Sequence, residues 1–473
     1  MLPSTPATRP FFGPRETVLA LFQITLLGGC SLHAPDPAPQ PGIEAPAYST
    51  GAVPSPMAES PPWWQTLEST RLNDYVTRAL GTSRTVEAAQ ARLEQAEAVY
   101  QRAAAAQWPA LDLKAHQEKD LKTETPRGEY KDLGFAASWE LDFFGRLKNT
   151  RIARGMDRES RAQLLRVARL SLSVNVAESF LGVIEQKQLL RLLNNQKASA
   201  VEFLKIIQER FDQGLISRVD LLQQQSQVAD IQSLIPDAEA NLRVQQNLLS
   251  TLVLGRPTEG AALDFDDTLP AVSSLAAIGR PDELLLRRPD LLALKADLMA
   301  ADADIGRAMA ERLPKLTFAA DALLVDGRLK EGVLSTMTPS FLLPLLDWGN
   351  RRAEVVRSKA VYRERFAIFA QGYLDAILEV ENAVLREGKQ KELITTLEER
   401  RDLLTEVLTQ TQGRYKNGLT DYLPVLTSLQ QLNAVEQRLI RERRKLLSFR
   451  VALHRALGGP LPEEMQTAGT GRS

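Results

Sequence analysis

The sequence RFDQGL at residues 210–215 recurs as RYKNGL at residues 414–419, at an offset of 204 residues. The same offset pairs Gly145 with Gly349, and in both places an aspartate and an aromatic residue come just before the glycine. Similarity at a fixed offset is the signature of a structural repeat. The chain therefore consists of two copies of one unit of about 200 residues.

The stretch that follows each Gly-Leu pair carries apolar residues at intervals of seven. These positions are Leu221, Val228, Ile235, Leu242 and Leu249 in the first copy, and Val425, Leu432, Leu439, Leu446 and Leu453 in the second. A sustained heptad pattern predicts a helix packed along a coiled-coil seam. An amphipathic helix in a globular bundle is the alternative, but it would drift from a strict period of seven. Pro236 lies inside the first of these helices and is expected to kink or interrupt it.

Two long segments precede these helices, at residues 155–211 and 352–415, and carry apolar residues at three- and four-residue spacings. If unbroken, each would form a helix of roughly 85 to 95 Å, which no compact globular domain needs. Each long helix is expected to end at a Gly-Leu turn and to return along its partner. Each copy therefore contains a helical hairpin, with Gly214 and Leu215 at one tip and Gly418 and Leu419 at the other.

The part of each copy that precedes the long helix alternates in the manner of β-strands. Over residues 130–144, one face carries Phe135, Trp139, Leu141 and Phe143, and the other carries Glu140 and Asp142. Residues 111–116 form a second strand of this kind. In the second copy, residues 316–320 alternate more weakly and residues 340–346 are apolar on both faces. The sequence thus predicts four strands, and the two strands of the first copy have one apolar and one polar face.

The composition excludes several classes of protein. The chain has 58 basic and 59 acidic residues and a net charge of −1, which argues against a nucleic-acid-binding protein. Its single cysteine and three histidines are scattered from Cys30 to His454, so we expect no disulfide, no metal site and no cofactor. No run of 18 apolar residues occurs, so no transmembrane helix is expected.

The first thirty residues have the pattern of a secretion signal. Two arginines precede the apolar stretch 18–27, which runs into LGGC at residues 27–30. This tetrapeptide resembles a bacterial lipobox, in which the signal is cut before the cysteine and the thiol carries diacylglycerol. Cys30 is therefore expected to be the lipidated mature N-terminus, and Ser31 in place of aspartate favours the outer membrane. The alternative is an ordinary secretory signal with an incidental buried cysteine.

These features divide the chain into five parts. They are a signal peptide at 1–29, a lipidated N-terminus and Pro-rich linker at 30–62, the two repeats at 63–260 and 261–462, and a disordered tail at 463–473. The linker has few large apolar residues, so its composition cannot bury a core and is typical of an extended segment.

Strands of about ten residues with one apolar face are the sequence signature of an outer-membrane barrel. The lipid cannot hydrogen-bond an open sheet edge, and four strands cannot close a barrel because eight is the usual minimum. Several copies of the chain must then share one barrel. The alternative is a soluble four-stranded sheet covered by the heptad helices, which explains neither the secretion signal nor the helix length.

Several of these stretches resemble the TolC-like outer-membrane efflux proteins, specifically the NodT-type lipoprotein branch. They are SWELDFFGR at 138–146, LRRPDL at 286–291, Asp347-Trp348-Gly349 and the duplicated Gly-Leu hairpins, and the resemblance covers about residues 63–462. It implies a mainly α chain that forms a homotrimer, with a twelve-stranded outer-membrane β-barrel and a long periplasmic α-helical tunnel. It also implies a passive exit duct without enzymatic activity, served by a periplasmic adaptor and an inner-membrane pump of the resistance-nodulation-division type.

Individual motifs favour structural roles. Pro289 and Asp290 suit the first turn of a helix, and Asp142 and Asp347 suit the cap between strand and helix. Glu140 and Asp142 on the polar face are expected to line the barrel lumen, whereas the apolar face is expected to contact lipid. Two carboxylates this close also fit acid-base chemistry, but the motif contains no histidine or nucleophile, so catalysis is not expected.

In TolC-like channels the hairpin tips close the duct at rest and meet the adaptor when it opens. By resemblance, Asp220 matches an aspartate of the closing network and Tyr415 matches its tyrosine partner. Thr420 stands where an arginine is expected, and the constricting aspartates are replaced by Pro424 and Thr427. The remaining candidate set is Arg218, Asp220, Tyr415 and Asp421. The alternative is that all four are solvated tip residues.

A periplasmic helical-hairpin adaptor would also be a secreted lipoprotein with coiled-coil hairpins. Such an adaptor normally carries one hairpin between the halves of small β domains, whereas two hairpins are predicted here. The sequence favours the exit duct, and it identifies neither the exported compound nor the cognate pump.

Overall fold

The computed structural model describes residues 33–37, 39–43, 48, 62–118, 130–257, 263–271, 278–327 and 332–459. The predicted signal peptide, Cys30 and the predicted tail at 463–473 lie outside the described residues.

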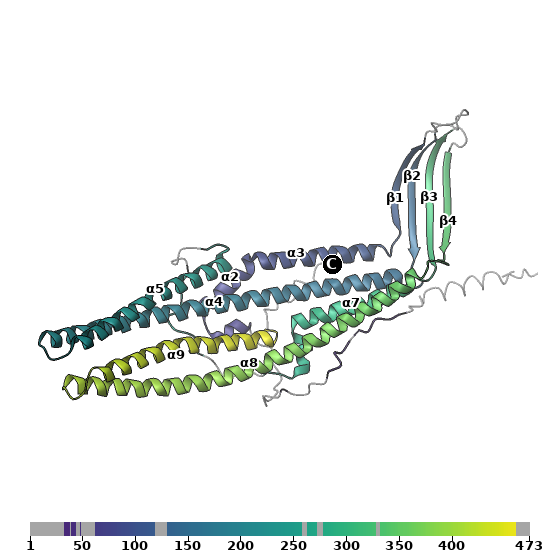
Figure 1. Ribbon diagram of the computed structural model, residues 1–473. Helices are drawn as coiled ribbons and strands as arrows, with labels where there is room; N and C mark the ends of the chain where they lie inside the picture. The colour runs from purple at the N-terminus through teal and green to yellow at the C-terminus, as the bar shows by residue number, and fades with distance from the viewer. Residues whose placement is uncertain are drawn as a thin grey trace, which may run out of the picture. The chain divides into compact units, whose positions relative to one another are not determined.

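Each half of the chain has the same order of elements, shown in Figure 1. The first half contains a 3-10 helix (Trp63–Leu67), α2 (Thr70–Thr82), α3 (Arg84–Ala105), β1 (Ala110–Glu118), β2 (Tyr130–Leu141), α4 (Arg146–Asp212) and α5 (Arg218–Leu254). The second half contains a 3-10 helix (Pro281–Glu283), α6 (Leu284–Arg287), α7 (Pro289–Ala310), β3 (Lys315–Gly327), β4 (Gly332–Leu342), α8 (Asn350–Lys416) and α9 (Leu423–Ala456). The helices α4 and α8 both have 67 residues and both begin and end 204 residues apart, which confirms the predicted repeat.

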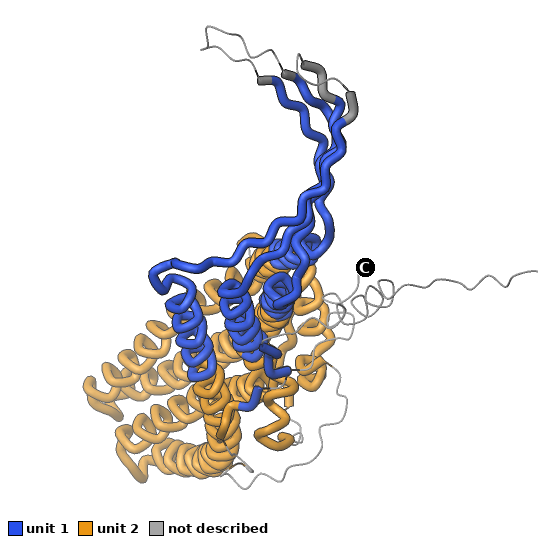
Figure 2. The backbone as a smooth tube through the Cα atoms, turned by 90° about the vertical axis from the view of Figure 1, so that its right-hand side faces the viewer, with its two compact units in different colours: residues 1–40, 95–159, 295–367 blue, residues 41–94, 160–294, 368–473 orange. Residues whose placement is uncertain are grey.

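The chain divides into two compact units, coloured separately in Figure 2. Unit 1 comprises residues 1–40, 95–159 and 295–367 and contains all four strands of the sheet. Unit 2 comprises residues 41–94, 160–294 and 368–473 and contains both hairpin tips.

The long helix of the first repeat begins nine residues earlier than the predicted start at residue 155. Gly145, in the left-handed conformation at φ +78°, precedes the helix, and the Asp142 carboxylate accepts a hydrogen bond of 2.6 Å from the Lys148 amide. Asp347 accepts in the same way from the amides of Gly349 and Arg351, at 3.0 and 3.2 Å. Both aspartates are therefore helix caps, as predicted. The prediction for the start was wrong because Gly155 is accommodated inside the helix.

The return helix α5 continues through Pro236 as one element, so of the kink or interruption predicted there, the interruption does not occur. Proline removes the hydrogen bond to the carbonyl four residues earlier, which belongs to Gln232. Both residues are exposed, so water can satisfy that carbonyl.

The heptad positions lie inward along both hairpins, since none of the ten residues is exposed. Leu221 and Val425 share one apolar cluster near the tips, and Leu439 packs with Ile394 and Leu397 of α8. Each return helix thus packs along its long helix, which confirms the predicted hairpins.

The largest apolar core lies in unit 2, where α2 and the start of α3 pack on the middle of α4. Trp63, Leu72, Phe180 and Leu249 belong to this core and are fully buried. One window of α4 is apolar enough to cross a membrane, but 67% of it is buried in the fold, which is typical of a core helix. Among the described helices, no other contains such a window.

The linker contributes to a core, contrary to the sequence-based expectation. Tyr48 is buried in a cluster with Ile278 and Tyr373, and Ile43 packs against that cluster. The linker needs no core of its own, because these two side chains complete a core formed by the second repeat.

The four strands form one antiparallel sheet in the order β1-β2-β3-β4, which confirms four strands with two per repeat. Every strand differs from its predicted bounds, and β1 and β3 extend beyond the predicted residues 111–116 and 316–320. The strand β2 ends at Leu141, because Asp142 turns to cap α4. The strand β4 spans Gly332–Leu342 instead of residues 340–346, and it stops before Pro344, which has no amide to donate.

Candidate functional site

One face of the sheet is apolar across all four strands. Residues that pair directly in an antiparallel ladder share a face. The register places Leu111, Leu113, Leu133, Phe135, Trp139, Leu141, Leu316, Phe318, Leu324, Met337 and Phe341 on this face. Leu113 and Met337 expose 67% and 73% of their surface. A contiguous exposed apolar surface of this kind marks a contact with a partner or a membrane.

The predicted lipid-face residues do not all lie on this face. Phe135, Trp139 and Leu141 belong to it, whereas Phe143 lies in the turn after β2 and is outside the sheet. The prediction for Phe143 was wrong because the alternation of the sequence continues past the point where the backbone leaves the ladder. The indole of Trp139 donates a hydrogen bond of 3.0 Å to the Gln107 carbonyl, near the beginning of β1.

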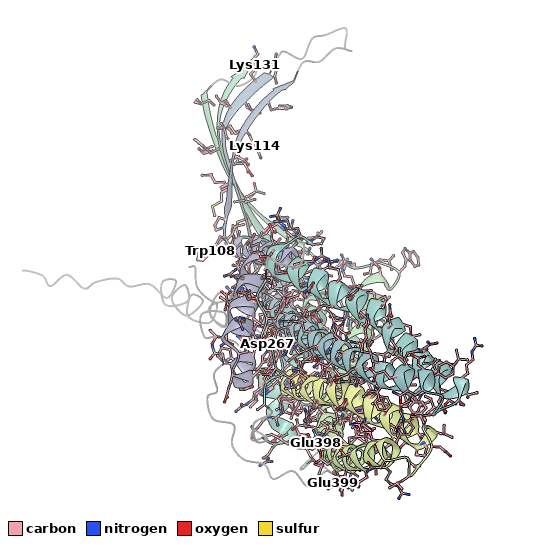
Figure 3. All side chains as sticks on the ribbon, turned by 90° about the vertical axis from the view of Figure 1, so that its left-hand side faces the viewer. Trp108, Lys114, Lys131, Asp267, Glu398 and Glu399 are labelled. Atoms are coloured by element: carbon pink, nitrogen blue, oxygen red, sulfur yellow. The ribbon has the colours of Figure 1, made fainter. Side chains whose placement is uncertain are left out.

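The opposite face of the sheet is polar. Asp112, Lys114, Ser138, Glu140, Thr317, Asp321, Thr336, Thr338 and Ser340 lie on it. Lys114, labelled on the sheet in Figure 3, forms an ion pair of 3.0 Å with Asp321 across the strands. Glu140 accepts two hydrogen bonds of 2.7 and 2.8 Å from Arg146. Asp142 lies outside the strand, so of the two predicted lumen carboxylates only Glu140 is on the sheet.

Gly134 allows β2 and β3 to approach closely at the middle of the sheet. A Cβ atom on this residue would lie 2.1 Å from the Ala322 carbonyl oxygen and 2.7 Å from the Leu323 Cα. Both are backbone atoms, so a side chain would force the strands apart. The glycine is therefore required by the sheet geometry.

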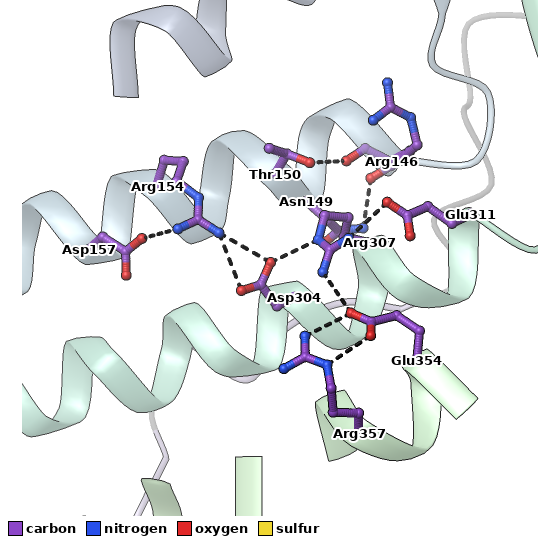
Figure 4. Close-up of polar contacts among 11 residues, drawn as sticks. Arg146, Asn149, Thr150, Arg154, Asp157, Asp304, Arg307, Glu311, Glu354 and Arg357 are labelled. Atoms are coloured by element: carbon purple, nitrogen blue, oxygen red, sulfur yellow. Dashed lines mark hydrogen bonds and ion pairs between the residues drawn. The ribbon is translucent and has the colours of Figure 1, made fainter. Parts of the chain in front are cut away.

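A network of charged side chains ties α4, α7 and α8 together in unit 1, as Figure 4 shows. Arg307 of α7 contacts Asp304, Glu311 and Glu354 at 3.0, 2.8 and 3.3 Å, and so reaches from α7 to α8. Arg154 of α4 pairs with Asp304 at 3.4 Å. Hydrogen bonds from Arg357, together with the Arg307 charge, lower the pKa of Glu354 to about 2. This network holds the three helices in register next to the strands.

The network was not found from the sequence, because its charges are spaced three and four residues apart on each helix. That spacing is also typical of a solvated helix surface. Only the packing of the three helices distinguishes a charged network between helices from a solvated helix surface.

In unit 2, each hairpin tip turns on a glycine in the left-handed conformation. Gly214 and Gly418 both have φ of +70°. The amide of Leu215 donates to the Arg210 carbonyl and that of Leu419 to the Arg414 carbonyl, each at 2.9 Å. These are Schellman-type ends, which favour glycine at this position. Leu215 and Leu419 themselves are exposed.

The four predicted gate residues have different environments. Asp220 forms a capping box at the start of α5, where it accepts hydrogen bonds from the Ser217 amide and hydroxyl at 3.1 and 2.8 Å. Arg218 and Asp421 are exposed, as the solvated alternative predicts, whereas Tyr415 is buried. Among the described residues, no hydrogen bond or ion pair joins these four side chains.

A cluster of aromatic residues lies behind the tips. Tyr422 stacks on Phe203 with ring centroids 6.1 Å apart, and Tyr415 meets Tyr422 edge to face at 5.8 Å. The Arg210 guanidinium lies 4.8 Å above the Tyr415 ring and donates a hydrogen bond of 2.9 Å to the Tyr415 carbonyl. Burial, the largest influence, raises the pKa of Tyr415 and of Tyr422.

The two tyrosine hydroxyls of this cluster differ in their partners. The Tyr422 hydroxyl donates to Oε1 of Gln224 on α5, and Nε2 of Gln224 donates to the Ala200 carbonyl at 2.7 Å. The Tyr415 hydroxyl is buried and has no hydrogen-bond partner among the described residues.

Tyr422 and Gln224 were not predicted from the sequence, although a signal for Gln224 exists. Gln224 lies three residues after the heptad position Leu221 and so falls on the seam of the coiled coil, where a polar side chain needs a partner. Tyr422 lies three residues before Val425, which is off the seam, so the heptad pattern gives no signal for it.

The described residues contain no group of three or more His, Cys, Asp or Glu side chains placed to hold a metal ion. The carboxylates of the sheet and of the α4–α7–α8 network form ion pairs with lysine and arginine side chains.

Comparison with known proteins covers almost the whole chain. A family model described as outer membrane efflux protein matches residues 75–255 and 280–459. Nodulation protein T of Rhizobium leguminosarum bv. trifolii is 25% identical over 447 residues, which cover 92% of this chain and 95% of that protein. The pyoverdine export outer membrane protein OpmQ of Pseudomonas putida is 28% identical over 472 residues, which cover 94% and 97%.

The fold of the chain is also similar to that of a solved outer-membrane channel. The outer-membrane channel OprN matches with a TM-score of 0.83 at 25% identity, and the match covers 90% of this chain and 98% of that one. The residues that the family model matches include the four strands and both helical hairpins.

Proposed function

We propose that this chain, which belongs to the outer membrane efflux protein family, is the exit duct of a tripartite efflux system in the outer membrane of a Gram-negative bacterium. It conducts small molecules passively from an inner-membrane pump and a periplasmic adaptor to the outside. Its relatives include a pyoverdine export outer membrane protein and a solvent efflux pump outer membrane protein of Pseudomonas putida.

The observation that carries this function is the sheet with one exposed apolar face and one polar face. An outer-membrane barrel needs lipid-facing side chains that alternate with side chains facing a water-filled lumen. Phe135 and Met337 lie on the first face, and Lys114, Glu140 and Asp321 lie on the second. A lipid-exposed sheet with a polar inner face supports a channel.

Three copies of the chain form the channel in this proposal, with four strands each and twelve in the closed barrel. Apolar side chains on α8 support contact between copies, because the described residues of the chain leave them exposed. Leu378, Leu385 and Leu403 expose 58%, 53% and 65% of their surface. A helix surface of this kind is expected to be buried by a neighbouring copy.

The N-terminus of the mature chain carries a covalent lipid on Cys30 in this proposal. Its support is the lipobox-like LGGC, which contains the only cysteine of the chain, and the likeness to nodulation protein T. Cells fed labelled palmitate should label the wild type and not Cys30→Ser, and an unlabelled wild type would refute lipidation.

The adaptor alternative fits the structure less well. It accounts for long hairpins but not for a sheet whose apolar face is exposed on all four strands, nor for the near full-length match to outer-membrane channels.

Conductance of the purified protein in a planar lipid bilayer tests the proposed function. The full-length lipoprotein, solubilised in mild detergent, is expected to run as a heat-sensitive trimer and to give discrete conductance steps. The same sample dissociated by heat should give none. An adaptor would show no conductance in either form, and that result would overturn the proposal.

A further inference from the structure

The two hairpins of the chain are joined behind their tips by a buried, uncharged hydrogen bond. Tyr422 occupies the N-cap position of α9 in the second hairpin, where its side chain makes no capping hydrogen bond, and Gln224 belongs to α5 in the first. The Tyr422 hydroxyl donates to Gln224 Oε1, and both side chains are almost completely buried, at 1% and 0% exposed. The other end of the Gln224 amide is held by the Ala200 carbonyl of α4 at 2.7 Å.

We propose that the Tyr422–Gln224 hydrogen bond is a latch that holds the hairpin tips together in the resting channel, and that the Tyr415 hydroxyl has no part in it. This inference rests on the proposed function and names a device that regulates the same duct. It replaces the gate that the family resemblance predicts around Asp220 and Tyr415.

The position of this bond between the hairpins is what makes it a latch. If the tips separate, α9 must move relative to α5, and the Tyr422 hydroxyl must leave Gln224. Both groups would then be without a partner until water reaches them, so the closed arrangement is favoured. Further from the tips, Gln430 donates to Gln227 at 2.8 Å and Gln196 donates to Glu436 at 2.9 Å. Tyr422 and Gln224 form the first of these contacts along α9, next to the tip.

The side chains at the predicted gate do not form such a bond. Asp220 is occupied by the Ser217 capping box within its own hairpin. The Tyr415 hydroxyl is buried without a partner in the described part of the chain, so its removal takes away no hydrogen bond. Arg210 contacts the ring and the carbonyl of Tyr415, and both remain in Tyr415→Phe.

The two tyrosines therefore provide a matched pair of variants. Tyr422→Phe and Tyr415→Phe each remove one oxygen atom from a buried ring of the same aromatic cluster. Only Tyr422→Phe breaks a hydrogen bond between the hairpins. Gln224→Met removes the same bond from the other side and keeps a similar side-chain volume.

Single-channel recording of full-length trimers in planar bilayers measures the resting open probability of each variant. Tyr422→Phe and Gln224→Met are expected to raise it on the order of tenfold, which corresponds to one hydrogen bond of about 1.4 kcal/mol. Tyr415→Phe is expected to match the wild type. The double variant of Tyr422 and Gln224 should have an open probability no higher than that of either single variant, because both substitutions break the same hydrogen bond.

The ionic strength of the bath separates this latch from an ion-pair gate. The ratio of open probability between Tyr422→Phe and wild type should stay within about twofold between 0.1 and 1 M KCl, because the bond is neutral and buried. A ratio that collapses at high salt would mean that charged groups hold the tips.

Recording from single trimers keeps the result independent of how much variant protein assembles. A wild-type open probability in both Tyr422→Phe and Gln224→Met overturns the latch, while wild-type conductance leaves the proposed function standing. Opening by Asp220→Ala with Tyr415→Phe, but not by Tyr422→Phe, would place the gate where the resemblance puts it. If the wild type shows no conductance, the proposed function itself is overturned.

Discussion

His454 is a basic residue that the fold keeps uncharged. Its ring stacks on Trp63 at 5.7 Å, and its Nε2 atom lies 3.2 Å from the Thr66 hydroxyl. Burial, followed by the positive charge of Arg450, lowers its pKa from 6.5 to about 4. Arg450 is itself held by two hydrogen bonds of 2.6 and 2.9 Å to the buried Glu387 carboxylate.

The first prediction is that acid destabilises unit 2 through His454. The unfolded chain binds a proton on this residue below pH about 6.5, whereas the folded chain does so only below about 4. The contribution of neutral His454 is therefore complete above pH 6.5 and is lost as the pH falls towards 4, by up to about 3 kcal/mol. The heat-dissociation temperature of wild-type trimers should fall between pH 7.5 and 5.

His454→Gln serves as the comparison, because glutamine does not titrate. Its heat-dissociation temperature should be lower than that of the wild type at pH 7.5 and should change less with acid. Parallel curves for the two proteins would assign the acid sensitivity to other groups.

At the scale of single residues, the sequence predicted polarity but not proximity. The heptad pattern predicted the buried faces of α5 and α9, because period and burial are linked directly. The alternation of β2 separated its two faces but could not show that the Ala322 carbonyl would lie 2.1 Å from a Cβ atom on Gly134. In the same way, Asp220 and Tyr415 were matched by their positions in the sequence. The hydrogen bond between the hairpins is instead made by Tyr422, because it depends on how the two hairpins pack.

At the scale of elements, a helix cap and a proline decide where the strands β2 and β4 end, and the apolar pattern of the sequence does not show either effect. The apolar alternation continues to Phe143, but Asp142 caps α4 and so ends β2 at Leu141. Residues 340–346 look like a strand apolar on both faces, yet the ladder ends before Pro344. The number of strands and the two helical hairpins could be predicted because the repeat supplies each of them twice.

The second prediction concerns the two faces of β2. A lysine on the lipid face at the bilayer midplane costs about 2–4 kcal/mol, and near the interface about 0–1 kcal/mol. Phe135 lies in the middle of the strand, and Trp139 lies near its end, where its indole contacts Gln107. Phe135→Lys should therefore reduce the amount of assembled trimer most, Trp139→Lys less, and Ser138→Lys on the polar face least.

Heat-modified migration of membrane extracts on SDS gels measures the trimer in each case. Equal losses for Phe135→Lys and Ser138→Lys would mean that the register of β2 does not separate lipid from lumen. The ordering of Phe135 and Trp139 tests the depth of the strand, because only depth distinguishes two residues on one face.

At the scale of the whole molecule, the sheet formed by the described residues of one chain has two open edges. The strands β1 and β4 each pair on one side only. Three antiparallel pairings in succession make β4 antiparallel to β1, so β4 of one copy can pair with β1 of the next as another antiparallel ladder. This contact joins different surfaces head to tail, and it closes into a ring only if the rotation between copies permits. Closure removes every open edge from the lipid.

The third prediction is that disulfides between these edges stop at three copies. Asp112→Cys on β1 is combined in turn with Thr336→Cys, Thr338→Cys or Ser340→Cys on β4, since all four positions share the polar face. At least one combination should bring two Cα atoms of neighbouring copies within about 7 Å and give covalent dimers and trimers on oxidation. Each single variant, which retains Cys30, should give none.

The largest cross-linked product reports how many copies share the barrel, because four strands come from each copy. Products that end at the dimer would indicate a barrel of eight strands, and products larger than the trimer would indicate a larger ring or an unclosed sheet. Only products that end at the trimer agree with a barrel of twelve strands.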